Sequence, residues 1–265
     1  MKKGFIFAKT STALFYYDVI KYFAEKGIEL VEVWDDECRF TVVLGGDGSV
    51  LGASRQAHQY PIFVINTGHL GFLTSCSKEN YRQAIDAFLE GHFTSTVRKL
   101  LELTIGDKKF TALNDVVIKD FPTGDGLARL VELSLYAGDE LVCHYRADGL
   151  IVSTPTGSTA YNLSANGPIV HPNCISLFVV TPICPQGLSQ RPLILPARYG
   201  TEPITLRVKS DDCNLFATID GQIGYRLQGQ DALIKFDGTS VEVVNPDLSY
   251  FEILQKKLGW GYKLV

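Results

Sequence analysis

One carboxylate, Asp47, lies in a glycine-rich turn between a strand and a helix. The stretch "RFTVVLGGDGSVLGASRQ", residues 39–56, runs from β-branched residues into Gly45, Gly46 and Gly48. Glycines let the backbone approach a ligand, and free N–H groups at a helix N-terminus can bind an anion. Because a carboxylate repels phosphate, we expect Asp47 to serve a metal ion, a sugar hydroxyl or a proton. A capping aspartate in a tight turn is the structural alternative.

Side-chain hydroxyls are concentrated in a second stretch, "RADGLIVSTPTGSTAYNLSANGPIVHP", residues 146–172. An apolar strand begins at Asp148–Gly149, and the hydroxyl residues after it are Thr154, Thr156, Ser158 and Thr159. These groups both donate and accept hydrogen bonds, so together they could bind a base, a ribose or phosphates. Alternatively, Thr154 or Thr156 caps a helix that continues through Ala160 and Leu163. A cap accounts for one hydroxyl and not for four.

Two shorter stretches complete the set. The loop "NTGHLGFLT", residues 66–74, contains Phe72 and follows a buried strand, and α/β proteins bind ligands at the carboxyl ends of strands. Asn114 can donate to and accept from adenine, and Asp115 can accept from ribose hydroxyls, although such a pair also suits a simple turn. The sequence contains no GxxxxGK[ST] phosphate loop and no GxGxxG after its first strand.

Strand and helix patterns alternate in the first ninety residues. Strands are predicted at 4–8, 28–33, 40–45 and 61–66, and helices from Ala13, over 49–58 and over 78–91. The first helix is expected to be capped by Ser11 or Thr12, to present Ala13, Tyr16, Ile20 and Phe23 on one face and to end at Gly27; Ser77 is expected to cap the third. Alternation of this kind predicts an α/β layer with parallel strands.

From Thr94 onward the pattern is that of β-structure. Hairpins are predicted around Gly106–Asp107 and Gly138–Asp139. Further short strands are expected within 203–210, 214–221, 232–238 and 240–245, and the last twenty residues return to helical periodicity. We therefore expect an α/β domain at 1–94 and 248–265, and a β-rich domain at 95–247.

The bulk properties exclude some classes of function. With 265 residues and a net charge of −4, the chain lacks the basic balance of a nucleic-acid-binding protein. The N-terminus has no apolar signal segment, and the longest apolar run, 175–184, is broken by Pro182 and is too short for a bilayer. A cytoplasmic protein without membrane partners is expected. Its six cysteines form no CxxC pair, which favours buried, reduced thiols over metal or disulfide chemistry.

Taken together, the four stretches resemble the ATP-dependent NAD kinase family over most of the chain. "GGDGS" resembles its GGDG motif, "NTGHLGFLT" is similar to its NxGxLGFLT segment, and Asn114–Asp115 lies at its Asn-Glu position. "DGLIVSTPTGSTAYNLSANGPIVHP" resembles the family's longest and most specific segment, and "LSQRPLILP" and "KKLGWGYKLV" also look like family segments. GGDG alone is shared with lipid kinases and phosphofructokinases.

The resemblance implies a fold class and a set of site residues. The fold would be a Rossmann-like N-terminal α/β domain, as in phosphofructokinases and diacylglycerol kinases, plus a C-terminal β-sandwich, with the active site between them in a homotetramer or homodimer. Asp47 would be the catalytic base. The resemblance assigns substrate binding to Asp47, Gly48, Asn114, Asp115, Arg146, Asp148, Thr156, Thr159, Ala160, Tyr161, Asn162, Leu163, Ser164 and Gln222, with Gly45, Gly46, Phe72, Ser158 and Arg129 as further candidates.

The implied reaction transfers the γ-phosphate of ATP to the 2′-hydroxyl of the adenosine ribose of NAD, giving NADP. Mg²⁺ or another divalent cation would be held mainly by the donor phosphates and not by fixed side chains, with Asp47 open as a further contact. A lipid or sugar kinase and a non-catalytic dinucleotide sensor are the rival functions. "TPTGSTAY" suits an adenosine pocket better than a lipid cleft, and a sensor would be expected to lose Asp47.

Two departures from the family pattern matter for the site. Asp115 replaces a glutamate, which shortens the carboxylate by one methylene and allows a water-mediated ribose contact. The region before GGDG is short, so the resemblance assigns no donor contact to it.

Overall fold

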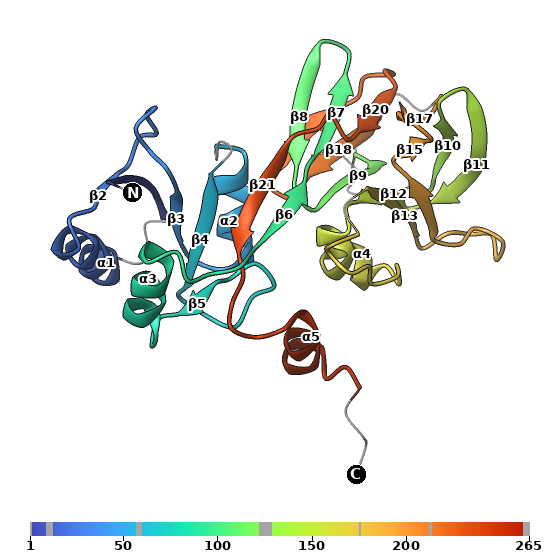
Figure 1. Ribbon diagram of the computed structural model, residues 1–265. Coiled ribbons are helices and arrows are strands. Elements are labelled where there is room, and N and C mark those ends of the chain that lie inside the picture. Colours follow the sequence, from blue (N-terminus) through green and yellow to red (C-terminus); the bar gives the residue numbers. More distant parts are fainter. Residues whose placement is uncertain are drawn as a thin grey trace. The chain divides into compact units, whose positions relative to one another are not determined.

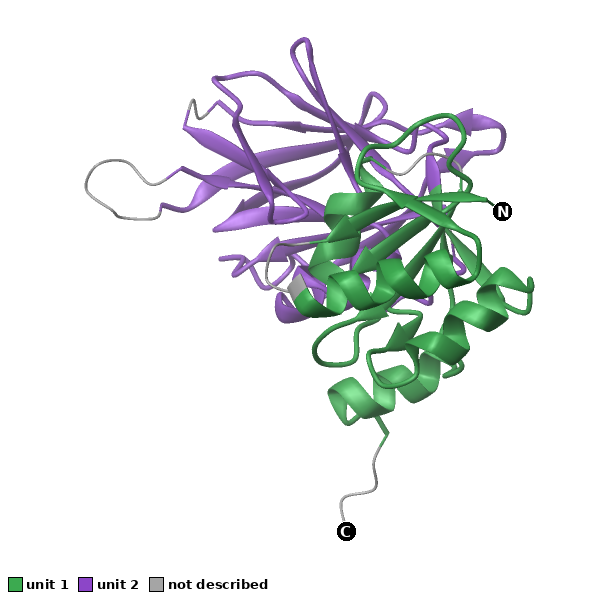
Figure 2. Cartoon of the chain, turned by 90° about the vertical axis from the view of Figure 1, so that its left-hand side faces the viewer, with its two compact units in different colours: residues 1–97, 241–265 green, residues 98–240 purple. Residues whose placement is uncertain are grey.

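A computed structural model describes residues 2–8, 13–56, 60–121, 129–174, 176–211 and 214–261. The chain divides into two compact units, which Figure 2 colours separately. The α/β unit comprises Met1–Val97 and Val241–Val265, and the β unit comprises Arg98–Ser240. Each unit has its own core of buried side chains.

The α/β unit is built on a largely parallel sheet with the strand order β2-β1-β3-β4-β21-β6, in which β5 also pairs with β4 (Figure 1). Its strands are β1 (Lys3–Ala8), β2 (Glu29–Val31), β3 (Thr41–Leu44), β4 (Pro61–Asn66), β5 (Cys76–Ser77), β6 (Ser95–Lys99) and β21 (Ser240–Val244). Strands β3 and β4 are apolar and almost wholly buried, as expected for parallel strands covered on both faces. Since these two strands are parallel, the turns after Leu44 and Asn66 leave the same edge of the sheet.

The described residues of this unit form the helices α1 (Ala13–Glu25), α2 (Asp47–Ser54), α3 (Tyr81–Leu89) and α5 (Tyr250–Leu258). Helix α1 buries Phe15, Val19 and Phe23, so its apolar face is rotated from the predicted one and leaves Tyr16 and Ile20 at its edge. The expected caps Ser11 and Thr12 lie outside the described residues, as do Ala57 and His58 of the predicted second helix.

The predicted starts of two helices were wrong. Helix α2 begins at Asp47 and not at residue 49, because the chain turns helical directly after Gly46. Helix α3 begins at Tyr81, and its N-cap is Asn80, three residues after the predicted cap Ser77. The Ser77 hydroxyl instead accepts the N–H of Glu79.

The β unit contains two antiparallel sheets with the strand orders β11-β10-β17-β20-β7-β8 and β14-β13-β12-β9-β18-β19, plus the pair β15-β16. Its elements are β7 (Leu101–Ile105), β8 (Lys108–Ala112), β9 (Asp115–Asp120), β10 (Val131–Ala137), β11 (Glu140–Ala147), β12 (Gly149–Ser153), the 3₁₀ turn η2 (Thr156–Thr159), α4 (Tyr161–Ser164), β13 (Leu177–Ile183), β14 (Leu193–Pro196), β15 (Arg198–Tyr199), β16 (Glu202–Pro203), β17 (Leu206–Lys209), β18 (Leu215–Ile219), β19 (Ile223–Arg226) and β20 (Ala232–Lys235). One buried cluster draws side chains from both sheets, so the unit is a β-sandwich.

Both predicted hairpins are confirmed: β7 pairs with β8 and β10 with β11, and Gly106 and Gly138 adopt positive φ in the turns. Strand β21 differs from the expectation. The sequence grouped 240–245 with the β-rich region, but this strand pairs in parallel with β4 of the first sheet. A short amphipathic strand carries no local signal of which sheet it joins.

The prediction for the cysteines was correct in part. All five described cysteines are free: Cys38 and Cys76 are buried, Cys143 is partly buried, and Cys174 and Cys184 are exposed. The last two contradict the expectation of burial, because they lie in connections where the chain leaves β13 or approaches it. Cys213 lies outside the described residues. Among the described helices, none has the length and apolar character needed to cross a membrane.

Candidate active site

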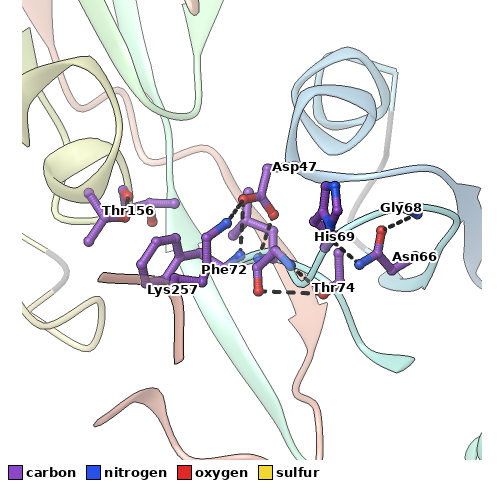
Figure 3. Close-up of polar contacts among 11 residues, drawn as sticks. Asp47, Asn66, Gly68, His69, Phe72, Thr74, Thr156 and Lys257 are labelled. Atoms are coloured by element: carbon purple, nitrogen blue, oxygen red, sulfur yellow. Dashed lines mark hydrogen bonds and ion pairs between the residues drawn. The ribbon is translucent and has the colours of Figure 1, made fainter. Parts of the chain in front are cut away.

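Asp47 is oriented by a loop and does not cap its own helix. Gly46 is the N-cap of α2, and the Asp47 side chain makes no capping bond. Its two oxygens instead accept the backbone N–H groups of Phe72, at 3.0 Å to Oδ2, and Leu73, at 2.9 Å to Oδ1 (Figure 3). The capping alternative is therefore excluded. The carboxylate is held in one orientation and is still partly exposed.

Two glycines allow this arrangement. A Cβ added at Gly71 would overlap the Asp47 carboxylate, so the loop can approach Asp47 only with glycine at that position. Gly45 has φ of +150°, and a Cβ there would overlap the Ser49 hydroxyl. Around Gly46, by contrast, the space is open, so this part of the turn is accessible to a ligand. Gly48, in the first turn of α2, is exposed.

The loop at 66–74 is stabilised from within. The Asn66 side chain donates to the His69 carbonyl at 2.6 Å and accepts the Gly68 N–H at 3.0 Å, and the Thr74 hydroxyl accepts the Gly71 N–H at 3.3 Å (Figure 3). These bonds close the loop at both ends, so the two N–H groups that hold Asp47 are themselves fixed.

A lysine that the motif analysis did not single out also contacts Asp47. Lys257 of α5 places Nζ 3.5 Å from Asp47 Oδ2 and 4.8 Å from the centre of the Phe72 ring. Helix α5 packs its first residue, Tyr250, against the same ring at 6.2 Å between centroids. Lys257 is separated from Asp47 by most of the chain, and no local spacing could have revealed the pair.

In the β unit, a second aspartate positions Asn114 and Asp115. Asp220 follows β18 with φ of +52°, and its carboxylate accepts the N–H groups of Leu113 (3.1 Å), Asn114 (2.7 Å) and Asp115 (3.2 Å). Asp220 was missed by the motif analysis, although it belongs to the "IDGQ" stretch that includes Gln222. The exposed Gln222 lies in the same turn, with its N–H on the Ile219 carbonyl.

Asp115 is a buried carboxylate beside that second acid. Its residue surface is only 4% exposed, and no described group donates a hydrogen bond to its side chain. Burial, with the negative charge of Asp220 as a second cause, raises the pKa of Asp115 from 3.8 to about 7. The protonation state of Asp115 should therefore change near neutral pH.

The four hydroxyls predicted to form one ligand-binding group have different roles. Thr154 donates to the Leu113 carbonyl at 2.6 Å and accepts the Gly157 N–H at 3.0 Å, while Ser158 donates to the Pro155 carbonyl at 2.7 Å and accepts the Val170 N–H at 3.0 Å. Both residues are fully buried and hold the turn together. Thr156 and Thr159 are partly exposed and lie at the two ends of η2.

Close approach of η2 to Asn114 requires Gly157, since a Cβ there would overlap the Asn114 carbonyl. Asn162 is also internal: its amide donates to the carbonyls of Ser158 and Pro168, and its oxygen accepts from Thr181 at 2.6 Å. On the outside of this short segment, Tyr161 and Ser164 are exposed, and Ala160 and Leu163 are partly exposed.

The remaining predicted residues lie away from Asp115: Asp148 directly precedes β12, and Arg146 belongs to β11 of the other sheet. Ser153, the last residue of β12, pairs with Asp115, whereas Asp148 precedes the first residue of β12 and its N–H donates to Ile183. Five residues of extended strand place Asp148 about 17 Å from the Asp115 end. Arg146 and Asp148 are exposed there, as is Arg129, whose N–H donates to Asp120 at the far end of β9.

No cluster of three or more acidic, histidine or cysteine side chains suited to a metal ion occurs in the described parts of either unit.

Two family models match the chain in succession. The ATP-NAD kinase N-terminal domain matches residues 17–93, and the ATP-NAD kinase C-terminal domain matches residues 113–241. An NAD kinase of Gemmatimonas aurantiaca is 40% identical over 248 residues, which cover 90% of this chain and 82% of that protein. An NAD kinase of Fusobacterium nucleatum is 35% identical over 258 residues, covering 94% and 93%.

Solved structures share the fold. Yeast NADH kinase in complex with NADH aligns with a TM-score of 0.84 at 22% identity, covering 100% of this chain and 90% of that one. An NAD kinase from Archaeoglobus fulgidus in complex with ATP aligns with a TM-score of 0.78 at 23% identity and covers 98% of both chains. The predicted fold class is confirmed. Because the family models and the relatives span most of the sequence, the chain belongs to the ATP-NAD kinase family.

Proposed function

We propose that this chain is an NAD kinase that transfers the γ-phosphoryl group of ATP to the 2′-hydroxyl of the adenosine ribose of NAD. The observation that carries the proposal is the Asp47 carboxylate, which the Phe72 and Leu73 N–H groups orient within an accessible glycine turn. Relatives named NAD kinase share at least 35% identity with the chain over most of its length.

In the proposed reaction the 2′-oxygen forms a bond to the γ-phosphorus. The bond between that phosphorus and the β,γ-bridging oxygen breaks, and ADP leaves with its electron pair. The hydroxyl proton passes to Asp47, which acts as general base or as orienting acceptor. Each Asp47 oxygen accepts one N–H bond, so further lone pairs remain for the substrate hydroxyl.

A divalent cation, Mg²⁺ by preference, would be held mainly by the donor phosphates, with Asp47 as the available protein carboxylate. Its charge would offset the negative charge of the transferred group. The arrangement around Asp47 fits this role, since one partly exposed carboxylate suits a cation that keeps most of its ligands from phosphate and water.

For NAD, we propose that the Asn114 amide and the Asp115 carboxylate hold the adenosine, together with the exposed side of the segment 156–164. Thr156, Thr159 and Tyr161 are the accessible side chains of that segment. Ser158 and Asn162, whose polar atoms are bonded internally, would shape the pocket from behind and not touch the nucleotide.

We further propose a homo-oligomer in which a second copy completes the site. The support is the separation of Arg146 and Asp148 from Asp115, at opposite ends of β12. Mixed oligomers of Asp47→Asn with Asp148→Ala would then regain activity that neither variant has alone. A monomeric mass with full activity would contradict this part of the proposal.

The test of the function is NADP formation from NAD, ATP and Mg²⁺, with NAD binding measured by calorimetry. NADP formation is expected, and no NAD binding at millimolar concentration would overturn the proposal. Binding without turnover would support a non-catalytic dinucleotide sensor, and phosphorylation of a lipid or sugar in place of NAD would support a lipid or sugar kinase.

We propose a cytoplasmic location, because all five described cysteines are free.

A further inference from the structure

We propose that Lys257, which pairs with Asp47, is the phosphate-binding cation of the transfer site and binds the terminal phosphate of the donor ATP. This inference rests on the proposed kinase function and adds a residue to it. Phosphoryl transfer needs positive charge at the transferred group, and the turn at 45–48 is followed by no lysine of the phosphate-loop kind.

The first support is the contact between the two charges. Lys257 Nζ lies 3.5 Å from Asp47 Oδ2, and in the described part of the chain it is the only side-chain cation paired with Asp47. The Lys257 side chain is 27% exposed and that of Asp47 is 32% exposed, so the pair is accessible to solvent. An anionic ligand that reaches Asp47 therefore also reaches the ammonium group.

The second support is the way in which the ammonium group is held. Lys257 Nζ lies over the Phe72 ring, and the backbone N–H of Phe72 donates to Asp47. Helix α5 is itself well defined at both ends, by a capping box between Ser249 and Glu252 and by Gly259 in the left-handed conformation. With α5 defined at both ends by its own caps, the Lys257 charge is directed at a carboxylate that is 32% exposed.

The pairing also answers an electrostatic difficulty. Asp47 and the donor triphosphate are both negative, so a bare carboxylate would repel the group that it must approach. A lysine that bridges them offsets the charge of Asp47 and stabilises the phosphate oxygens as the bond to the leaving ADP breaks. Lys257 would thus do from the C-terminal helix what a phosphate-loop lysine does from a neighbouring turn.

The experiment removes the charge and keeps the packing. Lys257→Met retains the apolar stem over Phe72, Lys257→Arg retains the charge, and Lys256→Met is the matched control on the same helix. Each variant is titrated with a non-hydrolysable ATP analogue and with AMP, and its turnover and unfolding temperature are measured. The analogue and AMP share the adenosine and α-phosphate and differ in the two terminal phosphate groups.

For Lys257→Met we expect affinity for the analogue to fall about 10-fold or more while AMP affinity is unchanged, and turnover to fall roughly 10²-fold. Lys257→Arg should recover part of both, and Lys256→Met should behave as wild type. Equal losses for AMP and the analogue, or wild-type values in Lys257→Met, would overturn the proposal. A lower unfolding temperature with no gain from arginine would reduce Lys257 to an anchor of α5.

The proposed kinase function can fail separately. If the wild-type protein forms no NADP but still binds the analogue in a Lys257-dependent way, the phosphate-binding role survives and the assigned acceptor is wrong.

Discussion

Asp47 in the α/β unit and Asp220 in the β unit both turn their carboxylates onto backbone N–H groups of a neighbouring segment. Asp47 accepts two, from Phe72 and Leu73. Asp220 accepts three, from residues 113 to 115. In each unit a carboxylate therefore fixes the backbone of a loop that is expected to face a nucleotide.

The two sites differ in the third partner. Asp47 is partly exposed and faces the cation of Lys257, whereas Asp220 is buried and faces a second acid, Asp115. N–H groups orient both carboxylates, but the neighbouring charge decides what each can do. The cation beside Asp47 attracts its charge, whereas burial, with the charge of Asp220 as a second cause, raises the pKa of Asp115 to about 7.

The largest expected effect is at the accessible carboxylate. Asp47→Asn keeps the size of the side chain and one acceptor oxygen but cannot take a proton, so turnover should fall roughly 10²–10⁴-fold while NAD affinity changes little. Turnover, NAD affinity and unfolding temperature are measured on the same variant. Normal turnover would contradict the role of Asp47 as a base.

A second substitution moves the same carboxylate without changing it. Gly71→Ala places a methyl group against the Asp47 oxygens, so we expect turnover to fall about 10²-fold through misplacement of the reacting group. Gly68→Ala is the matched control in the same loop, because a Cβ at Gly68 meets nothing within 4 Å. If both variants keep wild-type turnover, the close approach of the loop to Asp47 does not matter for activity.

Much of the fold was predictable because its signals are local. Continuous apolar runs marked β3 and β4, and Gly–Asp pairs marked both hairpins. The assignment of β21 to a sheet was not predictable, because its pairing with β4 joins residues about 180 positions apart in the sequence. The rotated face of α1 shows a similar limit, since aromatic residues at several positions could each have pointed inward.

The candidate site was predictable by residue type and less so by role. Motif spacing located Asp47 and Asp115, but the hydroxyl residues of 154–159 look alike in sequence, and only packing separates the buried Thr154 and Ser158 from the accessible pair. Asp220 resembled an ordinary turn residue, and Lys257, although it lies in the segment "KKLGWGYKLV", was given no role from the sequence. Both act through contacts with residues more than one hundred positions away.

Within the buried pair, Asp220 should have the larger effect on activity. Asp220→Asn loses the charge that accepts three N–H groups and turns an NH₂ toward donors, so Asn114 and Asp115 lose their fixed geometry. We expect NAD affinity to fall about 10-fold and stability to fall by about 1–3 kcal/mol. Calorimetry and denaturant unfolding measure the two losses, and unchanged values in both would show that the N–H bonds do not position the segment.

The smallest effect on activity is expected at Asp115, where the readout is pH. The folded-state pKa of about 7 lies above the ordinary 3.8, so the folded protein binds more protons than the unfolded chain between these values. The free energy of unfolding should therefore decrease as pH rises from about 4 to 7. Above that range Asp115 should cause no further decrease. Asp115→Asn removes this loss, so its unfolding temperature relative to wild type should be higher at pH 8 than at pH 5, by a few degrees.

NAD affinity in Asp115→Asn should fall less than 10-fold, because one acceptor oxygen remains for the ribose. Asp139→Asn, in an exposed hairpin turn, is the control for removing one carboxylate at the surface. Asp115→Asn tests the contrast with Asp47 directly: if its advantage over wild type is the same at pH 5 and pH 8, burial beside Asp220 does not raise the pKa of Asp115. The difference between a cation-paired and an acid-paired carboxylate would then lie in exposure alone.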